Sequence, residues 1–186
     1  MLKKVLSELA VKLNEKNIRW GVGASVMLNY YGLVDSPNDI DIIVSSDDSR
    51  VADKILMSLG EKNFSSDLEI YKSEFFANYS INGVEVDLIA GFSIKQNSSY
   101  FKYDFDKKSI TEIWNLEEIE IPVTAIEDWY ILYQLMPNKE EKVLLIEDYF
   151  LQKGSCRVDL LQKNIIKIKN DKVIKRTKKL IDRLKS

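Results

Sequence analysis

Asn82 and Gly83 lie between two runs in which apolar and polar residues alternate, "EFFANYSI" and "VEVDLIAGF". An Asn-Gly pair in this setting is the strongest short-range signal for a β-hairpin with a two-residue turn. Such a turn fixes the pairing of the two strands, so we expect Asn78 to lie opposite Asp87 on the same face. The apolar face then holds Tyr79, Ile81, Val84, Val86 and Leu88, and the polar face holds Asn78, Ser80, Glu85 and Asp87.

The remaining patterns predict a mixed α/β (α+β) fold. We expect helices at residues 1–16, 24–31 and 49–60, strands at 18–22 and 39–44, and one or two short strands within 109–123. From Ala125 the pattern is helical, in three or four pieces. This order predicts a mixed β-sheet with flanking helices and a C-terminal helical region. With a boundary near Pro122, the domains are residues 1–123 and 124–186.

The composition excludes whole classes of chemistry. The 186 residues include no histidine, so Ser-His-Asp and Cys-His mechanisms and zinc sites with imidazole ligands are excluded. Metal binding and proton transfer then depend on carboxylates, lysine, tyrosine or serine. The single cysteine, Cys156, fits a reducing compartment, and the N-terminal residues do not resemble a secretory signal. Since no apolar run reaches ~20 residues, we expect a cytoplasmic protein without a membrane helix.

The charge is distributed unevenly. Residues 163–186 hold ten lysines and arginines against two aspartates, a net charge of +8, so residues 1–162 carry −10 of the total of −2. A basic tail of this kind is typical of contact with RNA or another polyanion. It also fits an amphipathic last helix, in which lysines face water opposite Val173, Leu180, Ile181 and Leu184. We favour the amphipathic helix and keep RNA contact as the alternative.

Two aspartates interrupt an otherwise apolar strand in "PNDIDIIV", residues 37–44. On a strand, Asp39 and Asp41 point the same way, ~6.6–6.8 Å apart, while Ile40 and Ile42 point into the core. Two parallel carboxylates repel each other unless a cation lies between them. A solvated edge strand would also tolerate them, and for an isolated Asp-x-Asp that explanation is the simpler one.

The surroundings favour a site. Upstream, "GVGAS" is a small-residue turn that enters a helix, where backbone N–H groups and the Ser25 hydroxyl can bind phosphate. Downstream, Asp87 supplies a further carboxylate on the polar face of the hairpin. Carboxylate oxygens suit hard ions such as Mg²⁺ or Mn²⁺.

The ordered set "WGVGASVMLNYYGLVDSPNDIDIIV" and "INGVEVDLIAGF" resembles the core of the DNA polymerase β-like nucleotidyltransferase superfamily. The resemblance covers roughly residues 18–92, and it is strongest to the minimal and antibiotic-modifying members. It implies that Asp39, Asp41 and Asp87 bind Mg²⁺ or Mn²⁺ and act in catalysis, with Glu85 as a weaker candidate. It also implies that Gly23 and Ser25 contact the phosphates of an NTP, for which we expect ATP.

Two positions depart from the pattern of that superfamily. Ala24 stands where relatives have a turn glycine, and because alanine avoids positive φ we expect a differently shaped turn. Gln134 stands where many relatives have a lysine, and we expect Lys142 to supply the positive charge to the nucleotide instead.

The resemblance implies transfer of a nucleoside monophosphate from an NTP to a hydroxyl by a two-metal mechanism. The acceptor could be a small molecule such as an aminoglycoside or lincosamide antibiotic, a protein or a tRNA, and a homodimer could complete the site. The alternative is a non-catalytic nucleotide- or RNA-binding module on the same fold, including one in a toxin–antitoxin system. A third alternative is an interaction protein with an incidental acidic strand.

Overall fold

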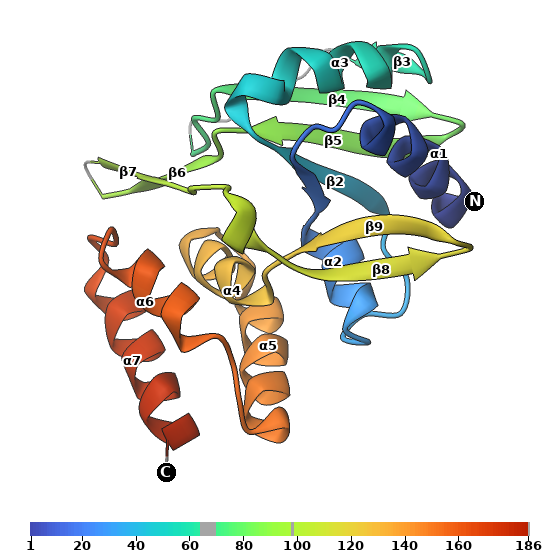
Figure 1. The fold of residues 1–186 in the computed structure, drawn as a ribbon. Coiled ribbons are helices and arrows are strands. Elements are labelled where there is room, and N and C mark those ends of the chain that lie inside the picture. The colour runs from blue at the N-terminus through green and yellow to red at the C-terminus, as the bar shows by residue number, and fades with distance from the viewer. Residues whose placement is uncertain (64–69, 98, 186) are drawn as a thin grey trace. The chain divides into compact units, whose positions relative to one another are not determined.

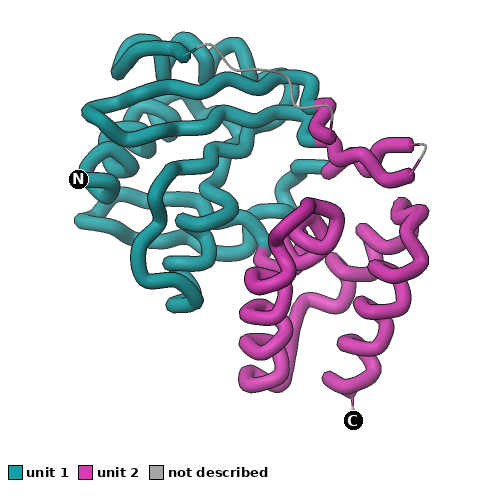
Figure 2. Tube along the Cα trace, turned by 180° about the vertical axis from the view of Figure 1, so that it is seen from behind, with its two compact units in different colours: residues 1–68, 73–92, 104–125 teal, residues 69–72, 93–103, 126–186 magenta. Residues whose placement is uncertain are grey.

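The computed structural model describes residues 1–63, 70–97 and 99–185, and the chain divides into two compact units. The first unit comprises Met1–Leu68, Ser73–Phe92 and Asp104–Ala125, and the second comprises Glu69–Lys72, Ser93–Tyr103 and Ile126–Ser186 (Figure 2). Residues 93–103 therefore group with the C-terminal helices. The predicted division into domains at residues 123 and 124 stays a prediction.

The first unit contains a mixed sheet with helices beside it, and the predicted fold class is confirmed (Figure 1). Its strands, within the described residues, are β1 (Trp20–Val22), β2 (Asp39–Val44), β3 (Glu61–Asn63), β4 (Phe75–Ile81), β5 (Val84–Ala90), β8 (Ile110–Leu116) and β9 (Ile119–Thr124). Its helices there are α1 (Leu2–Glu15), α2 (Ala24–Tyr30) and α3 (Ser49–Met57), with short 3₁₀ turns η1 (Ser46–Asp48) and η2 (Lys107–Ser109).

The sheet has the strand order β3-β4-β5-β2-β1-β9-β8. The hairpin β4–β5 is antiparallel and turns at Asn82 and Gly83, whose φ values of 49° and 75° suit the type I′ turn that this pair favours. Asn78 lies opposite Asp87, as predicted. β5 in turn pairs with β2 in parallel, so this strand pair joins segments that no short turn connects.

One face of the sheet is apolar and is covered by α1 and α3, which contact each other and the strands beneath them. On this face Tyr79 of β4 lies opposite Val86 of β5, which lies opposite Ile40 of β2. The Tyr79 hydroxyl donates a hydrogen bond to Asp53 of α3. Since side chains alternate along a strand, Asp41 and Asp87 point to the other face of the sheet, away from α3.

The second unit consists of helices and a small hairpin. Its helices are α4 (Ile126–Leu135), α5 (Glu140–Lys153), α6 (Val158–Ile165) and α7 (Asp171–Lys185), and its hairpin strands are β6 (Ser93–Gln96) and β7 (Ser99–Lys102). α4 contacts all three other helices and β6. Its residues 126–133 are all buried, as expected of a helix with partners on every side.

A buried carboxylate connects α4 to α6 and to the segment that follows β7. Asp128 of α4 is 1% exposed, and it accepts hydrogen bonds from Tyr103 Oη at 2.9 Å and from Asn164 Nδ2 of α6 at 2.6 Å. Burial raises the pKa of Asp128 to about 6, although both hydrogen bonds oppose this shift. Both carboxylate oxygens therefore have partners, and the helix core is held by a polar contact as well as by apolar packing.

The last helix is amphipathic. Val173, Leu180 and Ile181 are buried, and Leu184 is partly buried. On its polar side Arg176 pairs with Glu140 at 2.6 Å and with Glu147 at 2.7 Å, so part of the basic tail is engaged within the second unit. No helix in the described part of the chain is both long and apolar enough to cross a membrane.

Three strands differ from the sequence-based prediction. The hairpin β6–β7 and the edge strand β3 were not predicted, because these segments are short and carry no alternating pattern of apolar residues. The first helices and strands begin and end within three residues of their predicted limits, and residues 109–123 form two strands.

We predict that Asp128→Asn changes how stability depends on pH. The pKa of Asp128 is about 6 in the folded state, whereas the ordinary pKa of an aspartate, which applies to the unfolded chain, is 3.8. The folded state therefore keeps its proton to higher pH, and the unfolding free energy of the wild type should fall as pH rises between about 4 and 6. An amide mimics the protonated carboxyl and removes this dependence, which amounts to about 3 kcal/mol at most. Urea unfolding from pH 4 to pH 7 measures it, with the exposed Asp182→Asn as control. Equal slopes in the Asp128→Asn variant and the wild type would contradict the prediction.

Candidate active site

The predicted carboxylates lie on adjacent strands in matching register. In the parallel pair β2–β5, Asp41 lies opposite Asp87 and Asp39 lies opposite Glu85. Because opposed residues and residues two apart share a face, all four carboxylates are on the same side of the sheet. The structure therefore brings Asp39, Asp41 and Asp87 to one face, although 45 residues separate Asp41 from Asp87 in sequence.

The start of α2 and the glycine before it are hydrogen-bonded to β2, which carries Asp39 and Asp41. Ser25 Oγ donates to Asp39 Oδ1 at 2.9 Å, and the Gly23 N–H donates to the Asp41 carbonyl at 3.0 Å. The structure thus places Gly23 and Ser25 beside Asp39 and Asp41. A hydroxyl bonded to a carboxylate can also turn to a phosphate oxygen, since it is both a donor and an acceptor.

The surroundings of Asp87 raise its pKa above the ordinary value of an aspartate. Burial raises its pKa, the nearby charges of Asp39 and Glu85 raise it further, and a hydrogen bond from Asn78 opposes the shift. That bond joins Asn78 Nδ2 to Asp87 Oδ1 at 2.8 Å. A carboxylate with a raised pKa is a stronger base than an ordinary aspartate, which suits it to accept a proton from a hydroxyl.

The chemistry of these ligands suits Mg²⁺ or Mn²⁺, which prefer carboxylate oxygens. In the residues that the structure describes, however, no three acidic or other metal-binding side chains are gathered closely enough to hold an ion. Each of two carboxylates has a neutral donor: Ser25 donates to Asp39, and Asn78 donates to Asp87 from the β4 side.

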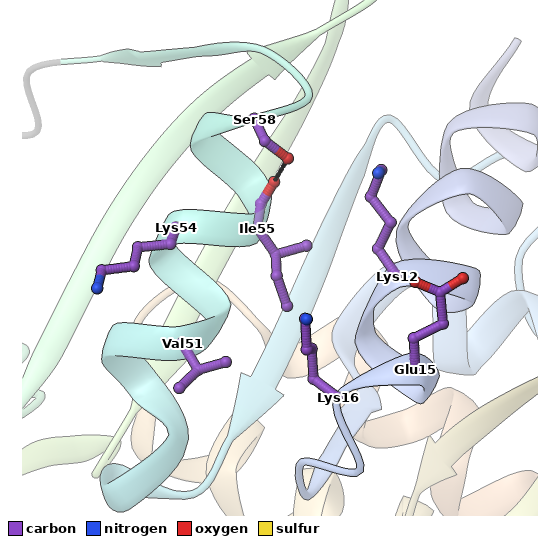
Figure 3. A pocket seen from close by; sticks show the side chains of 7 residues that line it. All are labelled: Lys12, Glu15, Lys16, Val51, Lys54, Ile55 and Ser58. Carbon is purple, nitrogen blue, oxygen red and sulfur yellow. Dashed lines mark hydrogen bonds between the residues drawn. The ribbon is translucent and has the colours of Figure 1, made fainter.

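The described residues also line a groove of about 390 Å³ between α1 and α3, and this groove is not the carboxylate site (Figure 3). Its lining residues are Lys12, Glu15, Lys16, Val51, Lys54, Ile55 and Ser58. Since α1 and α3 cover the apolar face of the sheet, the groove lies on the opposite side from Asp41 and Asp87.

Comparison with solved structures identifies the architecture. The chain is similar to the Thermotoga maritima nucleotidyltransferase-type protein TM1012, with a TM-score of 0.61 and 18% identity over 80% of this chain and 92% of that one. It is also similar to ANT(2")-Ia in complex with adenylyl-2"-tobramycin (TM-score 0.55, 13% identity, 80% and 89% covered). A third similar structure is the lincosamide adenylyltransferase LnuA bound to lincomycin (TM-score 0.51, 12% identity, 77% and 95% covered).

The chain has a nucleotidyltransferase-like fold. The similarity to nucleotidyltransferases that the motifs indicated is confirmed at the level of the fold, since these identities are low. The sequence itself matches no family model and no curated protein.

The turn of this nucleotidyltransferase-like fold contains a strained alanine. Ala24 has a φ of 42°, the left-handed conformation that we expected it to avoid. For a residue with a Cβ atom this conformation costs about 1–2 kcal/mol. Ala24 therefore adopts a positive φ despite its Cβ atom, and the contacts of Gly23 and Ser25 with β2 offset the strain.

The other departure lies in the second unit. Gln134 Nε2 donates to the Tyr130 carbonyl at 3.2 Å and to Thr177 Oγ1 of α7 at 3.4 Å, which is a packing role. Lys142 Nζ lies 5.2 Å from the centre of the Tyr133 ring. The predicted contact between Lys142 and a nucleotide stays a prediction.

Two polar residues beside the carboxylates were not singled out from the sequence. The hairpin register placed Asn78 opposite Asp87, so the signal for that residue was available. Asn63 gave no such signal, because β3 is a short edge strand whose pairing with β4 is visible only in the structure.

We predict that Ala24→Gly stabilises the protein by about 1 kcal/mol, because glycine adopts positive φ without the Cβ clash. Urea unfolding measures the change. The control is Ala52→Gly inside α3, which should destabilise by about 1 kcal/mol or more, since glycine is unfavourable in a helix and the buried Ala52 methyl group is lost. A loss of stability in Ala24→Gly similar to that of the control would show that the turn is not strained.

Proposed function

We propose that the protein is a nucleotidyltransferase that moves a nucleoside monophosphate from an NTP to an acceptor hydroxyl. The observation that carries this proposal is the opposition of Asp41 and Asp87 on one face of a sheet with the nucleotidyltransferase-like fold. The acceptor oxygen forms a bond to the α-phosphorus, the bond from that phosphorus to the pyrophosphate oxygen breaks, and pyrophosphate leaves.

Each residue of the site has a proposed role. Asp39 and Asp41 would hold Mg²⁺ or Mn²⁺, with Asp87 as a further ligand or as the base that takes the hydroxyl proton. When bound, the ions neutralise charge on the transferred phosphate and on the leaving group. Gly23, Ser25 and Lys142 would contact the NTP, for which ATP is our prediction.

The neighbours suggest which acceptors to test first. One solved structure holds adenylyl-2"-tobramycin and another holds lincomycin, both antibiotics with hydroxyl groups. We propose a hydroxyl-bearing antibiotic of the aminoglycoside or lincosamide type as the first candidate. A protein or tRNA acceptor, RNA contact through residues 163–186 and a homodimer stay predictions.

A second candidate function is a non-catalytic nucleotide- or RNA-binding module. Two observations favour it: the described carboxylates are not gathered as three metal ligands, and Gln134 is used in packing. Such a module would bind an NTP or RNA without transferring a nucleotide.

Labelled NTPs with Mg²⁺ or Mn²⁺, incubated with antibiotics, total tRNA and cell lysate, distinguish these two functions. We expect transfer of label to an acceptor, and we expect Asp87→Asn to slow it by about 10²–10⁴-fold, the contribution of a general base. Asp47→Asn, an exposed carboxylate change on η1, is the control and should transfer at the wild-type rate. NTP binding without transfer to any acceptor would favour the binding module.

Thermal melts test the metal ligands independently of the acceptor. Millimolar Mn²⁺ with a non-hydrolysable NTP should raise the melting temperature of the wild type. At a hundredfold excess of ligand over Kd, binding adds about 2.7 kcal/mol to the free energy of unfolding. Asp41→Asn should reduce this rise and leave the metal-free melting temperature unchanged or higher, because a repulsive charge is removed. Asp47→Asn should keep the full rise. Equal rises in Asp41→Asn and the wild type would remove Asp41 from the metal site.

A further inference from the structure

A row of polar side chains crosses four strands and ends at the candidate metal ligands. In register, Asn63 of β3 lies opposite Asn78 of β4, Asn78 lies opposite Asp87 of β5, and Asp87 lies opposite Asp41 of β2. All four residues share the polar face of the sheet. Two amides therefore lie on one side of the Asp87 carboxylate and an aspartate lies on the other.

The hydrogen bonds in this row have one direction. An ionised carboxylate only accepts, so the bond of 2.8 Å to Asp87 Oδ1 requires Asn78 to present its NH₂ group. The Asn78 oxygen then faces β3, where it accepts from Asn63 Nδ2 at 2.6 Å. Asn63 thereby fixes which way the Asn78 amide is turned, and each amide donates toward the carboxylates.

We propose that Asn78 is a positioning residue that holds the Asp87 carboxylate for a divalent cation, and that Asn63 acts through Asn78 by keeping its amide in the donating orientation. The inference rests on the proposed metal site of Asp39, Asp41 and Asp87. Asn78 engages one oxygen of Asp87, and in the described structure the other oxygen, Oδ2, makes no hydrogen bond. A neutral donor suits this task, because a lysine or arginine in its place would compete with the metal ion.

Because β3 is an edge strand, Asn63 can be mutated to test this proposal. Asn63 is exposed and its strand is at the end of the sheet, so a change there leaves the core packing intact. Asn63 Nδ2 also lies 3.5 Å from Glu85 Oε2, a long contact beside its bond to Asn78. Ser80 offers a matched control, since it is on the same face of β4, opposite Glu85, two residues from Asn78.

Binding of Mn²⁺ to the purified full chain, followed by electron paramagnetic resonance of the free ion, tests the role of Asn78 without any acceptor. We expect Asn78→Leu to weaken Mn²⁺ binding about tenfold or more, the usual effect of removing a residue that orients a metal ligand. Asn78→Ser, which keeps a hydroxyl donor, should recover part of the affinity, and Ser80→Ala should bind as the wild type does. Wild-type affinity in Asn78→Leu, with binding lost in Asp87→Asn, would overturn the positioning role while leaving the metal site in place.

A double-mutant cycle tests whether Asn63 acts through Asn78. We expect Asn63→Leu to weaken Mn²⁺ binding by a few-fold in the wild type and to have no further effect in Asn78→Leu, because the two residues act in one chain. Additive losses would overturn the coupling. If circular dichroism shows that Asn78→Leu does not fold, the Mn²⁺ affinity of Asn63→Leu alone tests the inference. An unchanged Mn²⁺ affinity in Asn63→Leu would then overturn it. Unchanged affinity in Asp87→Asn would instead overturn the metal site itself, and the inference with it.

Discussion

The candidate site depends on the register of the parallel strands β2 and β5. A slip of one residue would send Asp41 or Asp87 to the apolar face under α1 and α3, because side chains alternate along a strand. Burial of Ile40 and Ile42 on one strand, and of Val86 and Leu88 on the other, prevents this. The buried apolar residues therefore fix the register of β2 and β5, and this register determines where the carboxylates lie.

The carboxylates that the structure describes differ in their burial and in their partners. Glu147 is paired with the Arg176 guanidinium, and Asp128 is buried so deeply that its pKa rises. Asp39 and Asp87 also have neutral partners, the Ser25 hydroxyl and the Asn78 amide, as Asp128 has in Tyr103 and Asn164, but they are less deeply buried than Asp128. A hydroxyl or an amide orients a carboxylate and leaves its charge in place, which is the arrangement that a site for a cation requires.

Local signals predicted most of the fold. The Asn82–Gly83 pair determines its own turn, because both residues tolerate positive φ, and the alternation beside it assigns the faces of β4 and β5. The hairpin β6–β7 and the edge strand β3 escaped prediction for the opposite reason, since short strands with mostly polar residues carry no periodic signal. Asn63 was missed with them, although it contacts Asn78 directly.

The sequence by itself determined which side chains share a face: Asp39 with Asp41, and Asn78 opposite Asp87, since strand periodicity and a two-residue turn are local properties of the chain. Only the tertiary structure decided that β5 lies beside β2, with Asp87 at the level of Asp41, because parallel strands are joined by long connections that impose no register. It also decided that Ala24 adopts a positive φ, since the contacts of Gly23 and Ser25 with β2 outweigh the local preference of alanine.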